Sequence, residues 1–224
     1  MSGKVLVLRH QDDDGPANLA DWMTAQAITF EVRDVSVEAS VGHHFGATDW
    51  RAVVVLGSKE AAYDDSVPWL AWELEEVRRH LAAGRPVFGI CFGAQLLARL
   101  EGGEVKRAGT PERGWVTVSS DDEVLAGSWF AWHGDEITVP ERASVLARSA
   151  HCVQAFRIGR SLGVQFHPEV TADVVGEWLT EHRRQNQLHA VDGTSEALLR
   201  ETDSRIGAAT SAAHRLYAAF FTGI

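Results

Sequence analysis

The sequence predicts an α/β fold with three layers, in which a mostly parallel central sheet is flanked by helices on both faces. Short continuous apolar runs alternate with segments whose apolar residues recur at helical spacing, which is the pattern of βαβ units. The chain has 224 residues, of which 45% are hydrophobic and 23% are charged. This composition is ordinary for a globular chain and is sufficient for one sizeable core.

The first part of the chain supplies the expected parallel strands and the helices between them. Continuous apolar runs predict strands over residues 4–9, 29–35, 52–56 and 87–90. Helical spacing predicts one helix over 16–26 and another that carries Leu70, Leu74, Val77 and Leu81 on one face. We expect the second helix to end at Gly84, because Pro86 cannot continue it.

From residue 102 to residue 166 the pattern changes to closely spaced β segments, such as 115–118, 144–147 and 152–156. This spacing predicts extra antiparallel strands added to the parallel sheet. After Glu169 we expect a helix through Arg184, a polar linker over 185–194 and a long final helix. We therefore divide the chain into a domain over 1–184 and a linker with a C-terminal helical extension over 185–224.

An apolar stripe marks the final helix, expected from about Ser195 to Phe220. Its members recur at intervals of three, four or seven residues and are Leu199, Ile206, Ala209, Ala213, Leu216 and Phe220. We favour the interpretation that the helix packs on its own domain, because satellite helices usually cover the core that carries them. The alternative is a surface for a homodimer or for another partner.

Charge and the form of the N-terminus exclude several classes of function. The chain carries 21 basic and 31 acidic residues, a formal net charge of −10. Nucleic acids and anionic membrane surfaces need a clustered positive field, so we predict neither as a partner. No signal segment precedes the first strand and no apolar run reaches membrane-spanning length, so we expect a cytoplasmic protein.

The sequence predicts no metal and no cofactor. Cys91 and Cys152 are the only cysteines, and neither belongs to a Cys-x-x-Cys pair. Consecutive residues such as Asp12-Asp13-Asp14 and His43-His44 do not converge on one ion without other ligands, so we interpret the aspartates as a solvated loop. We read both cysteines as reduced thiols, because a disulfide between them would block the nucleophile proposed next.

Cys91 lies where a strand meets a helix and is flanked by Gly89 and Gly93. Glycines on both sides let the backbone take the tight bend from which a nucleophile projects. The Gly-x-Cys-x-Gly pattern is the thiol form of the nucleophile elbow, and the start of the helix favours negative charge on the sulfur. The alternative is a buried structural cysteine, because free cysteine is among the most buried residue types.

A second motif supplies a base and an orienting carboxylate. His167 and Glu169 flank Pro168, and in an extended segment residues two apart point to the same side. Glu169 can therefore orient His167, which would act as general base and acid for Cys91. Alone, this motif reads as a solvated surface segment; together with the elbow it indicates a catalytic triad.

These motifs resemble those of the class I glutamine amidotransferases, which adopt a flavodoxin-like fold and use a Cys-His-Glu triad to release ammonia from glutamine. The resemblance runs from about residue 4 to about residue 183 and is to a stand-alone domain similar to the glutaminase of GMP synthase. It rests on four segments: 89–95, 132–136, 154–157 and 165–169. It implies that Cys91 is the nucleophile, His167 the base and Glu169 its orienting group.

The resemblance also implies where the oxyanion and the substrate bind. The first oxyanion donor would be the amide of Phe92 and the second would come from the turn at Gly57 and Ser58, where Ser58-Lys59 replaces the family's usual second glycine and proline. The residues that resemble substrate contacts are Gln95, Arg113, Gly114 and Trp115. Gln95 has a second interpretation, as a helix residue that caps a neighbouring loop.

Three functions share this sequence signature. The first is a glutaminase that passes ammonia to a separate synthetase, with ATP used by that partner. We expect any such synthetase to be another chain, because the sequence contains no Gly-x-x-x-x-Gly-Lys-Ser/Thr phosphate loop. The second is a stand-alone hydrolase of glutamine or of a γ-glutamyl compound. The third is a non-catalytic interaction module on the same scaffold.

Overall fold

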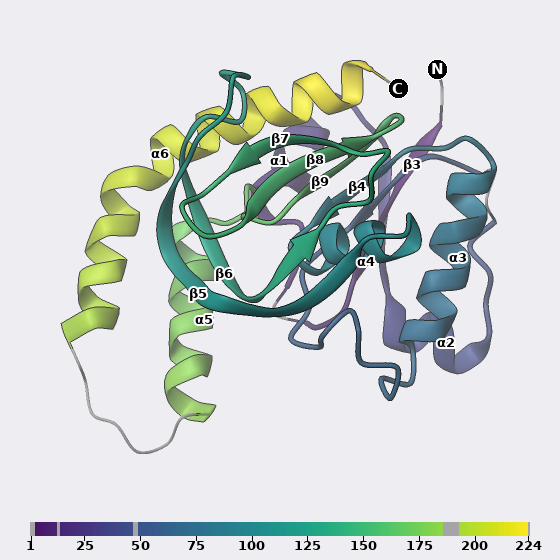
Figure 1. Cartoon of the computed structure of the whole chain (residues 1–224), viewed down its shortest axis with the longest axis horizontal. Coiled ribbons are helices and arrows are strands. Elements are labelled where there is room, and N and C mark those ends of the chain that lie inside the picture. Colours follow the sequence, from purple (N-terminus) through teal and green to yellow (C-terminus); the bar gives the residue numbers. More distant parts are fainter. Residues whose placement is uncertain (1–2, 13, 47–48, 186–192, 224) are drawn as a thin grey trace.

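The computed structural model describes residues 3–12, 14–46, 49–185 and 193–223. Its main feature is a seven-stranded sheet with the order β2-β1-β3-β4-β9-β8-β7. The five strands from β2 to β9 are parallel, and β8 and β7 continue the sheet in antiparallel fashion. A separate antiparallel ribbon, β5–β6, curves along one side of this sheet (Figure 1).

The strands and helices follow the chain in an alternating order as far as α4. The strands are β1 (Lys4–Arg9), β2 (Phe30–Asp34), β3 (Trp50–Val55), β4 (Val87–Ile90), β5 (Glu104–Val118), β6 (Gly127–Thr138), β7 (Ser144–Arg148), β8 (Val153–Ile158) and β9 (Ser161–Val164). The helices are α1 (Ala17–Ala25), α2 (Val35–Val41), α3 (Leu70–Ala82), α4 (Phe92–Leu100), α5 (Ala172–Gln185) and α6 (Gly193–Thr222).

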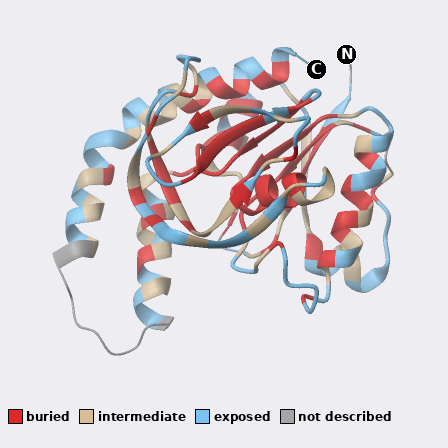
Figure 2. Cartoon of the chain, viewed as in Figure 1, coloured by how far each residue is buried: buried red, intermediate tan, exposed pale blue. Residues whose placement is uncertain are grey.

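Each face of the large sheet carries its own apolar cluster, because alternate strand residues point to opposite faces. On β1, Val5 and Val7 pack with α1 and α6, whereas Leu6 and Leu8 pack with α3 and α4. The buried residues accordingly concentrate in the strands and on the inner faces of these helices (Figure 2). The expected three-layer α/β fold with added antiparallel strands is confirmed.

Helix α6 crosses the outside of the sheet near α1 (Figure 1). Its buried residues Leu216, Tyr217, Phe220 and Phe221 belong to the same apolar cluster as Trp22. In this structure the C-terminal part of the apolar stripe is therefore covered by the chain's own sheet, whereas Leu199 and Ile206 pack against the cluster that contains Val175 and Leu179 of α5. The expected linker over 185–194 lies largely outside the described residues, which omit 186–192.

The predicted β1 and β4 have the observed bounds, and most other predicted elements differ by a few residues. The predictions missed α2 and β6. Helix α2 is short and begins directly after β2, where the side chain of Asp34 accepts hydrogen bonds from the amides of Ser36 and Val37. Within the described residues, no helix is long and apolar enough to cross a membrane.

Candidate active site

Cys91 joins β4 to α4 in a backbone conformation that few side chains adopt, with φ 51° and ψ −105°. The two flanking glycines are required by close approach. A Cβ atom on Gly89 would collide with the backbone of Gly93, and a Cβ atom on Gly93 would collide with the carbonyl oxygen of Val55. The strand, the turn and the helix are thus packed too closely for larger residues, as the sequence pattern predicts.

His167 and Glu169 follow β9, whose end lies beside the end of β4. The Nδ1 atom of His167 lies 2.7 Å from Oε1 of Glu169, and both side chains are at least 95% buried. The backbone amide of His167 donates to the carbonyl of Phe130, at 2.8 Å, which ties this segment to β6. The carboxylate therefore holds one ring nitrogen and leaves Nε2 for chemistry.

The surroundings of His167 favour its charged form. Burial of the ring disfavours the charge, but the nearby Glu169 and Cys91 outweigh it and raise the pKa of His167 well above its usual value. The indole of Trp178 packs edge-on against the ring, with 4.8 Å between the ring centres. An imidazolium beside the sulfur provides a proton at the point where a leaving amine would need one.

A cavity opens beside these residues at the carboxyl ends of the parallel strands, where ligands bind in such sheets. Four of the residues predicted for the site line it: Gly57, Ser58, Cys91 and His167. Phe92 is the next residue after Cys91 and starts α4, so its amide points from the helix N-terminus. The other lining residues are Gln11, Asp14, Lys59, Trp132, Trp178, Glu181 and His182.

Gln95 reaches this centre only through another side chain. It is buried on α4, and its amide nitrogen lies 3.3 Å from Oε1 of Gln165. Gln165 in turn places its own amide nitrogen 3.5 Å from the sulfur of Cys91. In this structure Gln95 therefore supports the segment before His167 and is not among the residues that line the cavity.

The segment Arg113–Trp115 lies on β5, opposite Trp132 and its neighbours on β6. Trp115 donates a hydrogen bond to Thr202 of α6, at 3.0 Å, and a Cβ atom on Gly114 would lie 3.1 Å from Leu198 of the same helix. In the structure these two contacts face α6, whereas the cross-strand partner Trp132 lines the cavity. Their predicted contact with substrate stays a prediction.

Several cavity residues were not predicted from the sequence. Trp178, Glu181 and His182 come from α5, where they lie at helical spacing on one face. Asp14 was interpreted as part of a solvated loop, and that interpretation is wrong for this residue because its exposed fraction is only 6%. Asp12 is exposed as expected, and Asp13 lies outside the described residues.

Asn18, at the start of α1, holds the segment that contains His167 and Glu169. Its side-chain amide donates to the carbonyls of Pro168 and Val170, at 2.9 and 3.0 Å, and its backbone amide donates to the carbonyl of Glu169 at 3.1 Å. Three consecutive carbonyl groups are thereby satisfied by one buried residue. No feature of the sequence indicated this role, because a lone asparagine has no local signature.

Comparison with known proteins places the chain in a family. The family model described as glutamine amidotransferase class-I matches residues 20–183. The chain belongs to the class I glutamine amidotransferases. The predicted resemblance is thereby confirmed over most of the described chain.

The similar curated proteins are larger than this amidotransferase. This chain is 34% identical over 173 residues to the glutamine-hydrolysing GMP synthase of Desulfotalea psychrophila. The aligned segment covers 68% of this chain and 32% of the relative. The corresponding enzyme of Nocardia farcinica is 36% identical over 163 residues, covering 65% and 30% of the two chains. The chain therefore spans about a third of the length of the curated relatives it matches.

Solved structures match the amidotransferase over 98% or more of its length. A glutamine amido transferase from Methylobacillus flagellatus has 27% identity and a TM-score of 0.87, with 100% of this chain and 96% of that chain covered. A glutamine amidotransferase from Thermotoga maritima has 24% identity and a TM-score of 0.84, with 98% of each chain covered, and supports the fold alone.

One buried group of side chains away from the cavity has the composition of a metal site. Potential ligand atoms of Glu112, His133 and Cys152 all lie within 4.8 Å of one another. Oε2 of Glu112, however, already accepts hydrogen bonds from His133, Cys152 and Gln154 at 2.6 to 3.3 Å. The amidotransferase thus joins β5, β6 and β8 here through a carboxylate with three donors.

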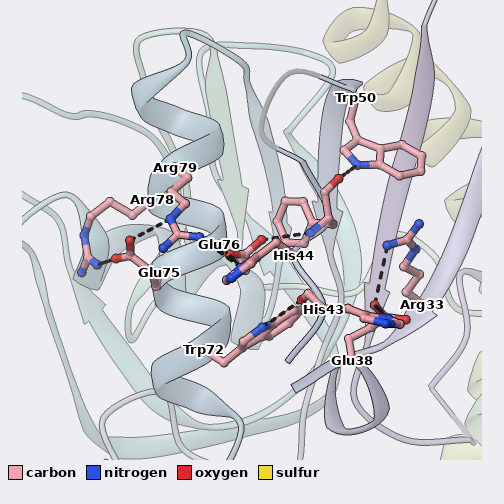
Figure 3. Close-up of polar contacts among 11 residues, drawn as sticks. Arg33, Glu38, His43, His44, Trp50, Trp72, Glu75, Glu76, Arg78 and Arg79 are labelled. Carbon is pink, nitrogen blue, oxygen red and sulfur yellow. Dashed lines mark hydrogen bonds and ion pairs between the residues drawn. The ribbon is translucent and has the colours of Figure 1, made fainter. Parts of the chain in front are cut away.

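The imidazole rings of the adjacent His43 and His44 contact different helices (Figure 3). His44 lies 2.6 Å from the buried Glu76 of α3, whereas His43 lies 3.8 Å from Glu38 of α2. Glu76 also accepts the backbone amide of Phe45 at 3.0 Å. These contacts tie the segment between α2 and β3 to its neighbouring helices and do not bring the two imidazoles onto one ligand.

Proposed function

We propose that this amidotransferase hydrolyses the side-chain amide of glutamine through a thioester on Cys91. The observation that carries the proposal is the placement of Cys91 and His167 in one cavity, with Glu169 held 2.7 Å from the ring of His167. A nucleophile, a base and an oriented carboxylate are the parts that acyl transfer needs. The family membership supports the same reaction.

In the proposed mechanism the sulfur of Cys91 attacks the amide carbon of the substrate. Negative charge develops on the carbonyl oxygen and is met by the backbone amides of Phe92 and Ser58. The carbon–nitrogen bond breaks, His167 gives its proton to the departing ammonia, and the acyl group remains on the sulfur. Water then loses a proton to His167 and attacks the thioester, which releases glutamate and restores the thiolate.

The charged lining of the cavity suits the other end of glutamine. Lys59 is basic and Asp14 is acidic, and both line the cavity with Cys91. A free amino acid carries an ammonium and a carboxylate group, so residues of both signs complement it. We propose that these two residues contact the amino-acid end of the substrate, while Gln95 acts through Gln165 and Arg113–Trp115 remain candidate contacts from β5.

We further propose that the ammonia passes to a separate synthetase. The matched segment makes up about a third of the relatives named as glutamine-hydrolysing GMP synthases, so their remaining length is available for an acceptor activity. Within this proposal residues 1–184 form the glutaminase domain and α6 is an extension that covers its sheet. Whether the partner uses ATP is settled by reconstitution with that partner.

The test is release of glutamate and ammonia from glutamine by the purified chain. Two matched variants each remove one thiol, Cys91→Ala and Cys152→Ala. We expect turnover in the wild type and in Cys152→Ala, and none in Cys91→Ala. A γ-glutamyl electrophile such as an aliphatic chloroketone should label Cys91 alone. Turnover that survives Cys91→Ala, or a cavity that accepts no γ-glutamyl compound, would contradict the proposal.

A further inference from the structure

His10 comes directly after β1, has a fully buried side chain and takes no part in the mechanism above. Its Nδ1 atom lies 2.6 Å from the carbonyl oxygen of Gly57, in the turn that follows β3. Its Nε2 atom lies 3.1 and 3.2 Å from the two carboxylate oxygens of Glu73, on the first turn of α3. The side chain of Glu73 is also fully buried.

These contacts decide where the protons of the pair reside. A carbonyl oxygen only accepts, so Nδ1 must carry a proton to bond Gly57, and the opposite nitrogen then shares a second proton with Glu73. Burial of the ring lowers the pKa of His10, but the charge of Glu73 and its hydrogen bond outweigh this and raise it. The contacts with Glu73 and Gly57 thus favour the charged form of the buried His10 ring.

Peptide geometry carries the effect of His10 to the next amide. In a trans peptide the carbonyl and the following N–H point in opposite directions within one plane. The carbonyl of Gly57 points to His10, so the N–H of Ser58 points away from it. Both residues line the cavity, and a Cβ atom on Gly57 would lie 3.2 Å from the ring of His167. Among the described residues the Ser58 N–H has no acceptor.

The same ring also contacts the side chain of Phe92, the residue whose amide is the first oxyanion donor. The imidazole of His10 packs edge-on against Phe92, with 4.7 Å between ring centres, and lies 4.9 Å from the ring of Trp69. Phe92 follows Cys91 and starts α4. His10 is thus in contact with both segments whose amides surround the cavity beside the sulfur.

We propose that the buried His10–Glu73 pair is the positioning element of the oxyanion hole, with His10 holding the Gly57–Ser58 peptide so that its N–H faces the reacting carbonyl. This inference rests on the proposed function. His10 is a positioning residue, since it touches neither the substrate nor the reacting atoms. The role also explains how a turn with Ser58 and Lys59 in place of glycine and proline keeps its direction: the anchor lies on the carbonyl side.

The test compares two variants of equal shape. In a Glu73→Gln background, which removes the buried charge, His10 is replaced by Asn or by Leu. Asparagine can still donate to the carbonyl of Gly57 at the position of Nδ1, whereas leucine cannot. We expect kcat for glutamine to fall by about 100-fold more in the leucine variant, since loss of one oxyanion donor costs roughly 10²–10³. KM and the alkylation rate of Cys91 should stay within about threefold.

Crystal structures of the same two variants provide a readout that needs no turnover. We expect the Gly57–Ser58 peptide to keep its direction with asparagine and to turn with leucine. If the leucine variant does not fold, the His10→Phe variant in the same background takes its place, because phenylalanine keeps the ring contact with Phe92 but cannot donate to Gly57. An unturned peptide together with equal kcat values would overturn the inference. If the wild type shows no Cys91-dependent turnover, the proposed function is overturned instead. The direction of the Gly57–Ser58 peptide in the two crystal structures would still test the role of His10.

Discussion

The hydroxyl group of Tyr217 on α6 donates a hydrogen bond of 2.8 Å to the side-chain oxygen of Asn18, 199 positions earlier in the chain. Burial, and then the charge of Glu169, raise the pKa of Tyr217 well above its usual value, so the phenol remains a donor. Because the oxygen of Asn18 faces Tyr217, its NH₂ group faces the carbonyls of Pro168 and Val170. A residue outside the family match thereby fixes the side chain that holds the His-Pro-Glu segment.

We predict that Asn18→Asp impairs the enzyme more than the similarly shaped Asn18→Leu. The carboxylate would face two carbonyl oxygens in a buried place, whereas leucine only removes the hydrogen bonds. We expect Asn18→Asp to lose about 3 kcal/mol of unfolding free energy and Asn18→Leu less, with kcat falling in the same order. Denaturant unfolding and glutaminase assays measure both. Equal effects of the two variants would show that the direction of the amide does not matter.

Tyr217→Phe tests the other end of this contact. Removing one hydroxyl group from a buried pair should cost about 1 kcal/mol and leave the aromatic packing of α6 intact. If Tyr217 orients Asn18, kcat should fall in this variant while KM for glutamine is retained. Tyr217→Phe combined with Asn18→Leu should then add little to Asn18→Leu alone, and additive losses in a double-mutant cycle would argue against the coupling.

The two thiols should differ sharply toward iodoacetamide. Cys152 is 7% exposed, and its desolvation, with the nearby charge of Glu112, raises the pKa of Cys152 to about 12. Since the thiolate is the nucleophile, Cys152 should stay unmodified at pH 8 in the folded protein. Cys91 lines the cavity and should react. Mass spectrometry of digested wild type and Cys152→Ala measures this, and modification of Cys152 before unfolding would contradict the burial described here.

The buried carboxylate of Glu112 should make the unfolding free energy fall in acid. Burial raises its pKa, but the hydrogen bond from His133 and those from Ser149 and Cys152 outweigh this and lower the pKa of Glu112 to about 2. A depressed folded-state value gives stability that is present above the unfolded value, near 4.5, and is lost as pH falls toward 2. We expect the unfolding free energy of the wild type to fall by about 3 kcal/mol more than that of Glu112→Gln over this window. Parallel curves would contradict the assignment.

The elbow tolerates no side chain beyond hydrogen at Gly93. Gly93→Ala would press a methyl group into the carbonyl oxygen of Val55, so strand β3 or helix α4 must move. We expect a loss of more than about 3 kcal/mol or failure to fold, because overpacking of a rigid backbone typically costs 1–3 kcal/mol or more. Gly109→Ala is the matched control, since a Cβ atom there meets nothing within 4 Å. Similar melting temperatures for both variants would refute the packing argument.

Local patterns were sufficient to predict much of the fold. Strand β4 and the elbow are readable because a continuous apolar run, a glycine pair and a helix start all lie within a few residues of Cys91. Helix α2 was missed because it is short, begins directly after β2 and is defined by its N-cap at Asp34. Strand β6 was missed because it is part of a long curved ribbon whose pairing with β5 is a tertiary contact.

The walls of the site were less accessible to sequence reasoning than its centre. The chemistry of Cys91 and His167 requires a particular local backbone around each residue, and the residues that permit this backbone form a motif in the sequence. Trp178, Glu181 and His182 line the cavity only because α5 packs beside the segment after β9, which no short pattern encodes. The roles of Asn18 and His10 depend on contacts with residues that are distant in the sequence, so no local pattern identifies either residue.

The positive φ angle of Cys91 lowers the stability of the fold at the same residue that supplies the proposed nucleophile. A side chain held at φ 51° costs on the order of 1–3 kcal/mol, whereas glycine takes this conformation freely. Cys91→Gly should therefore melt at a higher temperature than the wild type while losing its nucleophile. A protein engineer who needs this fold without activity would therefore gain thermal stability from Cys91→Gly, a substitution that abolishes the proposed mechanism.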